Sequence, residues 1–138
     1  WVYLHRIDEL RRSGRISTAT AVVSTALANR PIMRVSDGRM EMAAKTRTQS
    51  KAFAKLVELA QIRAEGEPVF VAIAQNEARE AARSLQQLLQ ESLPEGSSFM
   101  LVDLDPTLAV HSGPGAISVS CVFSSEVVDT PVEKPGRR

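Results

Sequence analysis

The chain is poor in the residues that build several common kinds of protein. It has one cysteine, Cys121, and two histidines, so it offers neither a disulfide framework nor a Cys and His cluster with metal-binding spacing. No run of about 18 apolar residues occurs, and no signal peptide with a basic start, an apolar core and a cleavage site is present. These absences indicate a soluble segment without a predicted membrane span or metal site.

An excess of charge of one sign is also missing. The 17 Lys and Arg residues nearly balance the 16 Asp and Glu residues, which leaves a formal net charge of +1. Neither half of the chain carries the basic stripe that nucleic-acid binding requires, so we expect no nucleic-acid partner. Cys121 falls in an apolar, strand-like segment and is expected to be a small buried residue, not a reactive thiol.

Familiar catalytic motifs are missing too. The sequence has no Gly-x-Ser-x-Gly elbow and no Gly-x-x-x-x-Gly-Lys phosphate loop after a strand. Asp103 and Asp105 could present two carboxylates to a metal or a proton transfer, but Asp105-Pro106 is more simply a turn opener. We therefore expect no enzymatic activity. A hydrolase using His111 with this pair is the weaker alternative.

Length and periodicity predict one α/β domain. With 138 residues and 43% hydrophobic content, the chain can bury a working core. Apolar spacing predicts helices near 7–10, 18–30, 53–64 and 78–93, and strands at 1–4, 32–35, 40–44, 69–74, 99–102 and 117–123. This order predicts an α/β sandwich with a mixed sheet. Residues 125–138 are too polar to form a core and are expected to be a disordered tail.

Three local features sharpen this prediction. Asp37-Gly38 supplies the positive backbone angles of a tight antiparallel hairpin. The run 69–74 is continuously apolar, which is typical of a strand covered on both faces. Asn76 follows this run and is predicted to cap the next helix.

The segment His111-Ser112-Gly113-Pro114-Gly115 is the most informative part of the sequence. Its glycines reach backbone angles closed to other residues, and its proline fixes one angle, so the segment is shaped as a sharp turn. Residues 107–110 alone separate it from the turn at 103–106, which predicts a surface connection where ligand contacts concentrate. The alternative is a structural turn with a solvent-facing histidine.

Two basic clusters offer further candidates. Arg11, Arg12 and Arg15 surround Gly14 at the start of a predicted helix, where backbone N–H groups and a guanidinium can hold a carboxylate or phosphate. The alternative is that these arginines stay in water and balance a helix dipole. The segment 45–51 either meets an acidic partner or is a solvated connection, with Thr48 or Ser50 capping the next helix.

Five segments with these features follow one another along the chain. They are residues 10–17, Arg30-Pro31-Ile32, Asp37-Gly38, residues 45–48 and residues 111–116. Their order resembles the carboxyl-terminal domain of the DegV family of bacterial fatty-acid-binding proteins over residues 1–124. The Leu-x-x-x-Gly-Arg-Ile and His-x-Gly-Pro-Gly segments are the most specific part of the resemblance.

The resemblance implies a cytoplasmic protein that holds a long-chain fatty acid between two domains and presents the carboxylate to a separate fatty acid kinase. No cofactor and no catalysis by the binder itself are implied. His111 is similar to the family histidine near the fatty-acid head group, and Arg15 to the arginine facing the same carboxylate or acyl phosphate. Ser112, Gly113 and Gly115 supply the backbone of the binding loop. Arg47 is similar to an arginine on the kinase-docking face.

The same resemblance leaves part of the family's architecture unaccounted for. Residues 1–124 match the lipid-binding carboxyl-terminal domain, and the amino-terminal domain has no counterpart. Because Trp1 falls within a predicted strand, we expect the sequence to be a piece of a longer chain. An isolated domain of this kind should expose apolar surface, which favours either a homodimer or poor lipid binding. The alternative function is an interaction or regulatory domain without a ligand.

Overall fold

The computed structural model describes residues 1–5 and 30–123. Within these ranges the chain forms β1 (Val2–Tyr3), β2 (Ile32–Ser36), β3 (Arg39–Ala44), α3 (Gln49–Ala64), β4 (Val69–Gln75), α4 (Arg79–Ser92), β5 (Ser98–Asp103), α5 (Pro106–Ser112) and β6 (Ile117–Phe123). The helices predicted before residue 30 and the tail predicted at 125–138 lie outside the described residues. In the described part of the chain, no helix combines the length and apolarity needed to cross a membrane.

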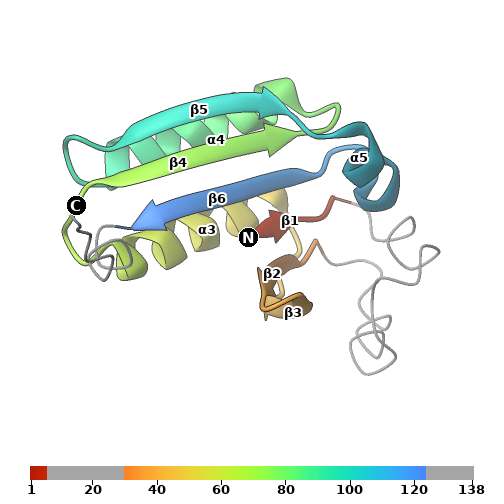
Figure 1. Cartoon of the computed structure of the whole chain (residues 1–138), viewed down its shortest axis with the longest axis horizontal. Helices are drawn as coiled ribbons and strands as arrows, with labels where there is room; N and C mark the ends of the chain where they lie inside the picture. Colours follow the sequence, from red (N-terminus) through yellow and green to blue (C-terminus); the bar gives the residue numbers. More distant parts are fainter. Residues whose placement is uncertain (6–29, 124–138) are drawn as a thin grey trace, which may run out of the picture.

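The described strands form one mixed sheet. Their order across the sheet is β3-β2-β1-β6-β4-β5, with β4 and β5 parallel and every other pair antiparallel. This arrangement confirms the predicted α/β class with a mixed sheet. The carboxyl ends of β4 and β5 point toward α5, and β6 starts from the same end of the sheet (Figure 1).

Helices α3 and α4 cover one face of this sheet (Figure 1). In α4, Ala82, Leu85 and Leu89 recur every three or four residues and are fully buried. Burial of each leucine stabilises the fold by about 1.5–3 kcal/mol relative to an exposed side chain. The predicted core face of this helix is therefore confirmed at these positions, whereas Leu88, which was predicted on the same face, is 40% exposed.

The opposite face of the sheet carries exposed apolar side chains, which makes the prediction of a fully covered β4 wrong. Phe70 in β4 is 42% exposed, although Val69 and Val71 on either side of it are buried. The strand register places Phe70 beside Val122 of β6. On β4, β5 and β6 the exposed apolar members of this face are Phe70, Met100, Val102 and Val122, and we call them the open-face row. A continuous apolar run cannot distinguish a strand covered on both faces from one with an apolar exposed face.

The predicted hairpin and helix cap are confirmed. Asp37 and Gly38 connect β2 to β3 with φ angles of 54° and 73°. Thr48 caps α3, since its hydroxyl accepts a hydrogen bond from the backbone N–H of Lys51 at 3.1 Å.

Two other local predictions are wrong. Asn76 does not cap α4, whose N-cap residue is Ala78. Residues 107–110 belong to α5 and not to an irregular connection. Asp105 accepts a hydrogen bond from the Thr107 N–H at 2.9 Å, and Pro106 lies in the first turn. Aspartate and proline at these positions start a helix as readily as they open a turn.

Candidate functional site

His111 lies half-buried in the last turn of α5, at the carboxyl end of the parallel strands. The helix ends at Gly113, whose φ is 81° and whose N–H donates to the Ala109 carbonyl at 3.0 Å. The buried Ser112 hydroxyl donates to the Leu108 carbonyl at 2.7 Å. Glycine adopts a positive φ at little cost. Gly113 therefore lets the chain turn sharply while the preceding turn, with His111, stays helical.

Asn76, the residue after β4, bonds to this turn through both its backbone and its side chain. The Gly115 N–H donates to the Asn76 carbonyl at 2.8 Å, and the Asn76 N–H donates to the Ala116 carbonyl at 3.0 Å. The side-chain amide donates to the Gly113 carbonyl at 2.9 Å and lies 3.4 Å from the Ala109 carbonyl. Because each such bond contributes about 1 kcal/mol net, this set fixes the turn against the end of β4.

His5 packs against the other side of the same turn. Gly115 has a φ of +87°, and a Cβ atom placed on it would lie 2.7 Å from the His5 Cβ and 2.8 Å from the His5 Cγ. His5 Nδ1 lies 2.9 Å from the hydroxyl of Tyr3, which is fully buried and hydrogen-bonded to the Arg30 side chain. Burial raises the pKa of Tyr3, so its hydroxyl keeps its proton at neutral pH. Polar contacts that run from Arg30 through Tyr3 to His5 therefore support the turn.

A surface hollow of about 650 Å³ lies beside this turn. Its lining includes Pro114, Gly115 and His5, together with residues at or just before the amino termini of α3 and α4: Gln49, Glu77, Ala78, Arg79, Glu80 and Ala81. Helix amino termini carry a partial positive charge that favours anions. The two glutamates in the lining add negative charge to the same rim.

The basic segment before α3 is tied to this region. The Arg30 N–H donates to the Thr46 carbonyl and the Thr46 hydroxyl donates to the Arg30 carbonyl, both at 2.7 Å. Arg47 follows Thr46 and is exposed, two residues before Gln49 in the hollow. Arg47 therefore lies two residues along the chain from Gln49, which lines the hollow.

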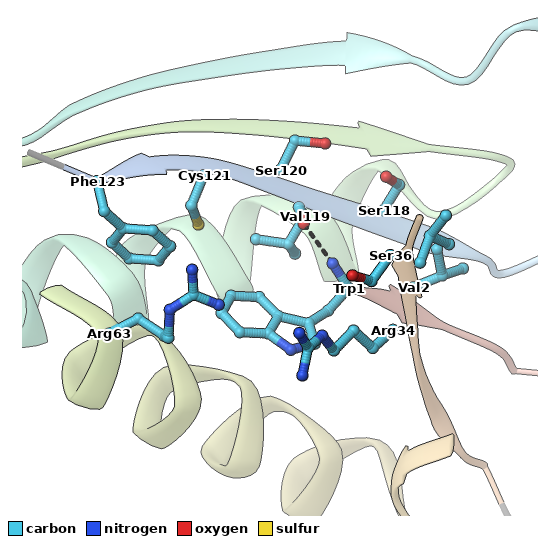
Figure 2. Close-up of a pocket in the computed structure, with 11 residues that line it drawn as sticks. Trp1, Val2, Arg34, Ser36, Arg63, Ser118, Val119, Ser120, Cys121 and Phe123 are labelled. Atoms are coloured by element: carbon cyan, nitrogen blue, oxygen red, sulfur yellow. Dashed lines mark hydrogen bonds between the residues drawn. The ribbon is translucent and has the colours of Figure 1, made fainter. Parts of the chain in front are cut away.

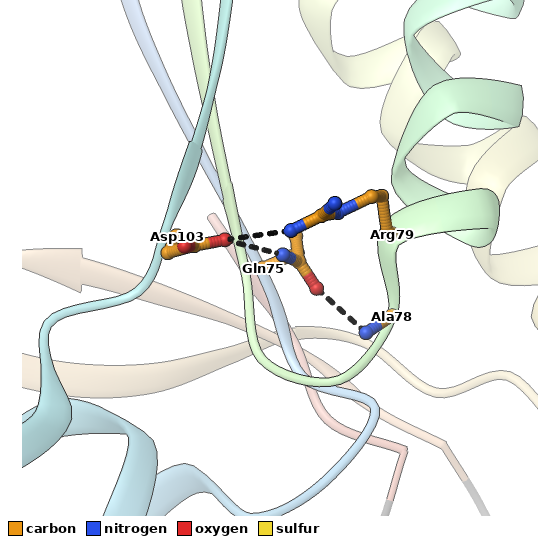
Figure 3. Close-up of polar contacts among 4 residues, drawn as sticks. All are labelled: Gln75, Ala78, Arg79 and Asp103. Atoms are coloured by element: carbon orange, nitrogen blue, oxygen red, sulfur yellow. Dashed lines mark hydrogen bonds and ion pairs between the residues drawn. The ribbon is translucent and has the colours of Figure 1, made fainter.

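The two aspartates of the predicted carboxylate pair are used separately. Asp103 accepts a hydrogen bond from the Gln75 side-chain amide at 2.8 Å and lies 3.9 Å from the Arg79 guanidinium (Figure 3). The side-chain amide oxygen of Gln75, Oε1, accepts from the Ala78 N–H at 2.6 Å. Asp105 caps α5. These contacts give each carboxylate a structural partner and do not aim the pair at a common point.

The structure brings together some of the predicted site residues. His111, Ser112, Gly113 and Gly115 form one compact turn, in which the N–H groups of both glycines bond within the protein. Arg15 lies outside the described residues, so its meeting with His111 stays a prediction.

Sequence reasoning missed Asn76 as a support of the turn, along with His5 and Arg30. Polar residues directly after the apolar run 69–74 were a usable signal, because ligand sites gather at the carboxyl ends of parallel strands. His5 offered a weaker signal of the same kind, at the end of the first predicted strand. Nothing local in the sequence indicated that Arg30 contacts Tyr3.

The close approach of His5 makes Gly115 the most sensitive position of the turn. Replacing Gly115 with Ala should lower the free energy of unfolding by about 2–4 kcal/mol, because a clash is added to the cost of a positive φ. Gly38→Ala is the matched control, since Gly38 has a similar φ of +73° and no atom near its missing Cβ. Urea denaturation followed by circular dichroism measures both variants.

A second substitution isolates the contact. In a His5→Gly background, Gly115→Ala should cost no more than Gly38→Ala does, because the atoms that clash with the new Cβ are gone. Equal costs for Gly115→Ala and Gly38→Ala in the otherwise unchanged chain would show that His5 does not press on the turn.

Known proteins resemble the chain over most of its length. It is 73% identical over 138 residues to the DegV domain-containing protein Cgl2349/cg2579 of Corynebacterium glutamicum, covering all of this chain and 50% of that protein. It is 36% identical over 119 residues to the DegV domain-containing protein SCO2569 of Streptomyces coelicolor, covering 86% of this chain and 42% of that one. The chain thus spans about half the length of the curated relatives it matches.

Solved structures show the same fold. The DegV family protein Cg2579 from Corynebacterium glutamicum matches with a TM-score of 0.86 and 79% identity, over 90% of this chain and 46% of that one. A DegV family protein from Thermus thermophilus, described by its fatty acid binding, matches with a TM-score of 0.78 and 26% identity, over 88% and 44%. Residues 1–124 match the family model described as "uncharacterised protein, DegV family", and the chain therefore belongs to the DegV family.

Proposed function

We propose that residues 1–124 form the carboxyl-terminal, lipid-binding domain of a protein that holds one long-chain fatty acid. The likeness to DegV proteins described as fatty-acid-binding carries this proposal. Besides the Thermus thermophilus protein, the fatty acid binding DegV family protein SAG1342 from Streptococcus agalactiae matches with a TM-score of 0.77 and 25% identity. The proposal is binding and not catalysis, in line with the separate structural roles of Asp103 and Asp105.

The head group of the lipid is assigned to the turn after α5. His111 and Arg15 would share the carboxylate, because an imidazole and a guanidinium both form charge-assisted hydrogen bonds with it. The N–H groups of Gly113 and Gly115 already donate within the protein. The role of the loop in binding is therefore to hold His111 in place. Ser112, the next residue, is buried.

The open-face row supplies apolar surface for the rest of the ligand or for the other half of the protein. Its members are 42–49% exposed, and it runs along the sheet to Val102, just before the connection into α5. An alkyl chain gains about 0.8 kcal/mol for each buried CH₂ group, so tail burial dominates the affinity while the head-group residues set the orientation.

The proposal includes a second step, in which the bound carboxylate is presented to a separate fatty acid kinase that docks on Arg47. This exposed arginine lies just before α3, whose first residue lines the hollow beside the turn. A kinase that docks on Arg47 would approach the side of the molecule where His111 is held. Exposed charges of this kind raise association rates and fix orientation more than they add affinity.

Lipid binding is tested by native mass spectrometry of the full-length protein purified from bacteria. We expect a population heavier than the polypeptide by the mass of one long-chain fatty acid, which denaturation releases. A full-length protein without added mass, even after incubation with palmitate, would contradict lipid binding and favour an interaction domain without a ligand.

The head-group assignment predicts an uneven effect of Arg15→Ala in the full-length protein. Transfer of a phosphoryl group to the bound fatty acid by the kinase should fall at least about tenfold, because the arginine faces the anion. Tail binding, measured by displacement of a fluorescent fatty acid, should change less than about threefold, because buried CH₂ groups dominate it. Arg39→Ala at the start of β3 is the control and should alter neither. Equal losses in both assays would count against the assigned role.

A further inference from the structure

The strand β5 forms an open edge of the sheet. It is the last strand in the order across the sheet, and β4 is its neighbour on the other side. Figure 2 shows β5, β4 and β6 side by side, with β5 outermost. Within residues 1–5 and 30–123, no strand pairs with the outer edge of β5. The strand is also regular, because its pairing with β4 keeps one register from Ser98 to Asp103.

The residues of β5 lack the features that usually keep sheet edges apart. Charged side chains, prolines and bulges are the common protections. The other edge strand, β3, carries Arg39 and Glu41 at exposed positions. In β5, residues 98–102 read Ser-Phe-Met-Leu-Val and include neither a charge nor a proline. Such an edge is a template for another strand.

Alternation along β5 identifies the backbone groups at this edge. The Leu104 N–H, just after the strand, donates to the Gln75 carbonyl of β4 at 2.8 Å. Successive residues of a strand present their backbone groups to opposite edges, so residues 98, 100 and 102 face β4 as residue 104 does. The N–H and C=O groups of Phe99 and Leu101 therefore face outward, away from β4.

We propose that β5 pairs with β5 of a second copy of this protein, in an antiparallel dimer centred on Met100. Residues opposite each other in an antiparallel pair share a face of the sheet, so Met100 can meet only another residue of the open face. With Met100 on the two-fold axis, Phe99 bonds to Leu101 of the partner subunit, and both are partly buried residues packed against the core. An axis at Leu101 would instead place Asp103 opposite Phe99.

The position of α4 suits the same arrangement. This helix contacts both β4 and β5, and neighbouring strands lie about 4.8 Å apart. A helix centred beneath this pair lies about half a strand spacing inside β5. The two copies of α4 in the dimer are then roughly 10 Å apart, which is close to the 8–10 Å at which helices pack.

The flank of α4 beside β5 is polar. Arg79 lies 3.9 Å from Asp103 of β5, which identifies this flank, and helical spacing continues it to residues 83, 86 and 90. A shallow hollow of about 520 Å³ follows the same residues, and its lining is Arg83, Gln86, Gln87, Gln90 and Glu91. A glutamine amide both donates and accepts hydrogen bonds, so this flank can pair with a copy of itself.

Charge complementarity favours a second copy as the occupant. Two α4 helices related by a two-fold axis run antiparallel, so residues equally far from the axis on either side face each other. With Gln87 nearest the axis, Arg83 faces Glu91 of the partner subunit. Gln87 and Met100 both lie near the middle of their elements, so one axis can pass close to both.

Disulfide cross-linking tests the axis in full-length protein whose native cysteines are replaced by serine. Met100→Cys should give a disulfide-linked dimer, because a non-bonded antiparallel pair holds its α-carbons about 4.5 Å apart, within the range for a disulfide. Ser98→Cys is the matched control and should not cross-link, because its two copies lie roughly 13 Å apart along the strands. Adding Val102→Cys to Ser98→Cys should restore the cross-link, since these positions face each other. Mass spectrometry under non-reducing conditions measures the products.

An exchange of charges tests the helix contact. In sedimentation velocity over a range of concentrations, Arg83→Glu should raise the dissociation constant of the dimer at least about fivefold, because like charges then meet twice across the axis. Adding Glu91→Arg should bring the constant back to within about twofold of its original value. Lys51→Glu on α3 is the control for the change in charge and should leave the constant unchanged.

A protein that stays monomeric at every concentration would overturn the proposal. So would cross-linking through Ser98→Cys as readily as through Met100→Cys, or a loss in Arg83→Glu that Glu91→Arg does not regain. A monomer whose Phe99 and Leu101 amides resist hydrogen exchange would overturn it as well, because it would assign the edge to another segment of the same chain.

Discussion

The hydrogen bonds of Asn76 to the turn between α5 and β6 are the constraint on which the candidate site depends. They join the end of β4, the end of α5 and the start of β6 at one point through the backbone and the side chain of one residue. Gly113 and Gly115 supply backbone angles that this arrangement requires. The position of His111 follows from them, because the helix that carries it ends in this turn.

Elements with strong periodicity could be predicted from the sequence, whereas features set by contacts between distant segments could not. The apolar stripe of α4 and the Asp37-Gly38 turn carry their own local signals. The side chain of Asn76 had two uses open to it, a helix cap or a bond to a distant carbonyl, and only the fold decides between them. The same holds for His5, whose contact with Gly115 joins residues far apart in the sequence.

One face of the described sheet is left partly uncovered. The open-face row presents apolar side chains on the face of the sheet opposite α3 and α4, where burial by lipid or protein would be favourable. This uncovered face fits a chain that spans about half the length of its relatives.

A crystal structure of the full-length protein with a long-chain fatty acid would show whether His111 and Arg15 share the carboxylate. We expect the carboxylate within hydrogen-bonding distance, about 2.7–3.2 Å, of both the His111 imidazole and the Arg15 guanidinium, with the Asn76 bonds to the turn intact. A carboxylate bound away from the turn after α5, or an Arg15 side chain on the opposite side of the sheet, would contradict it.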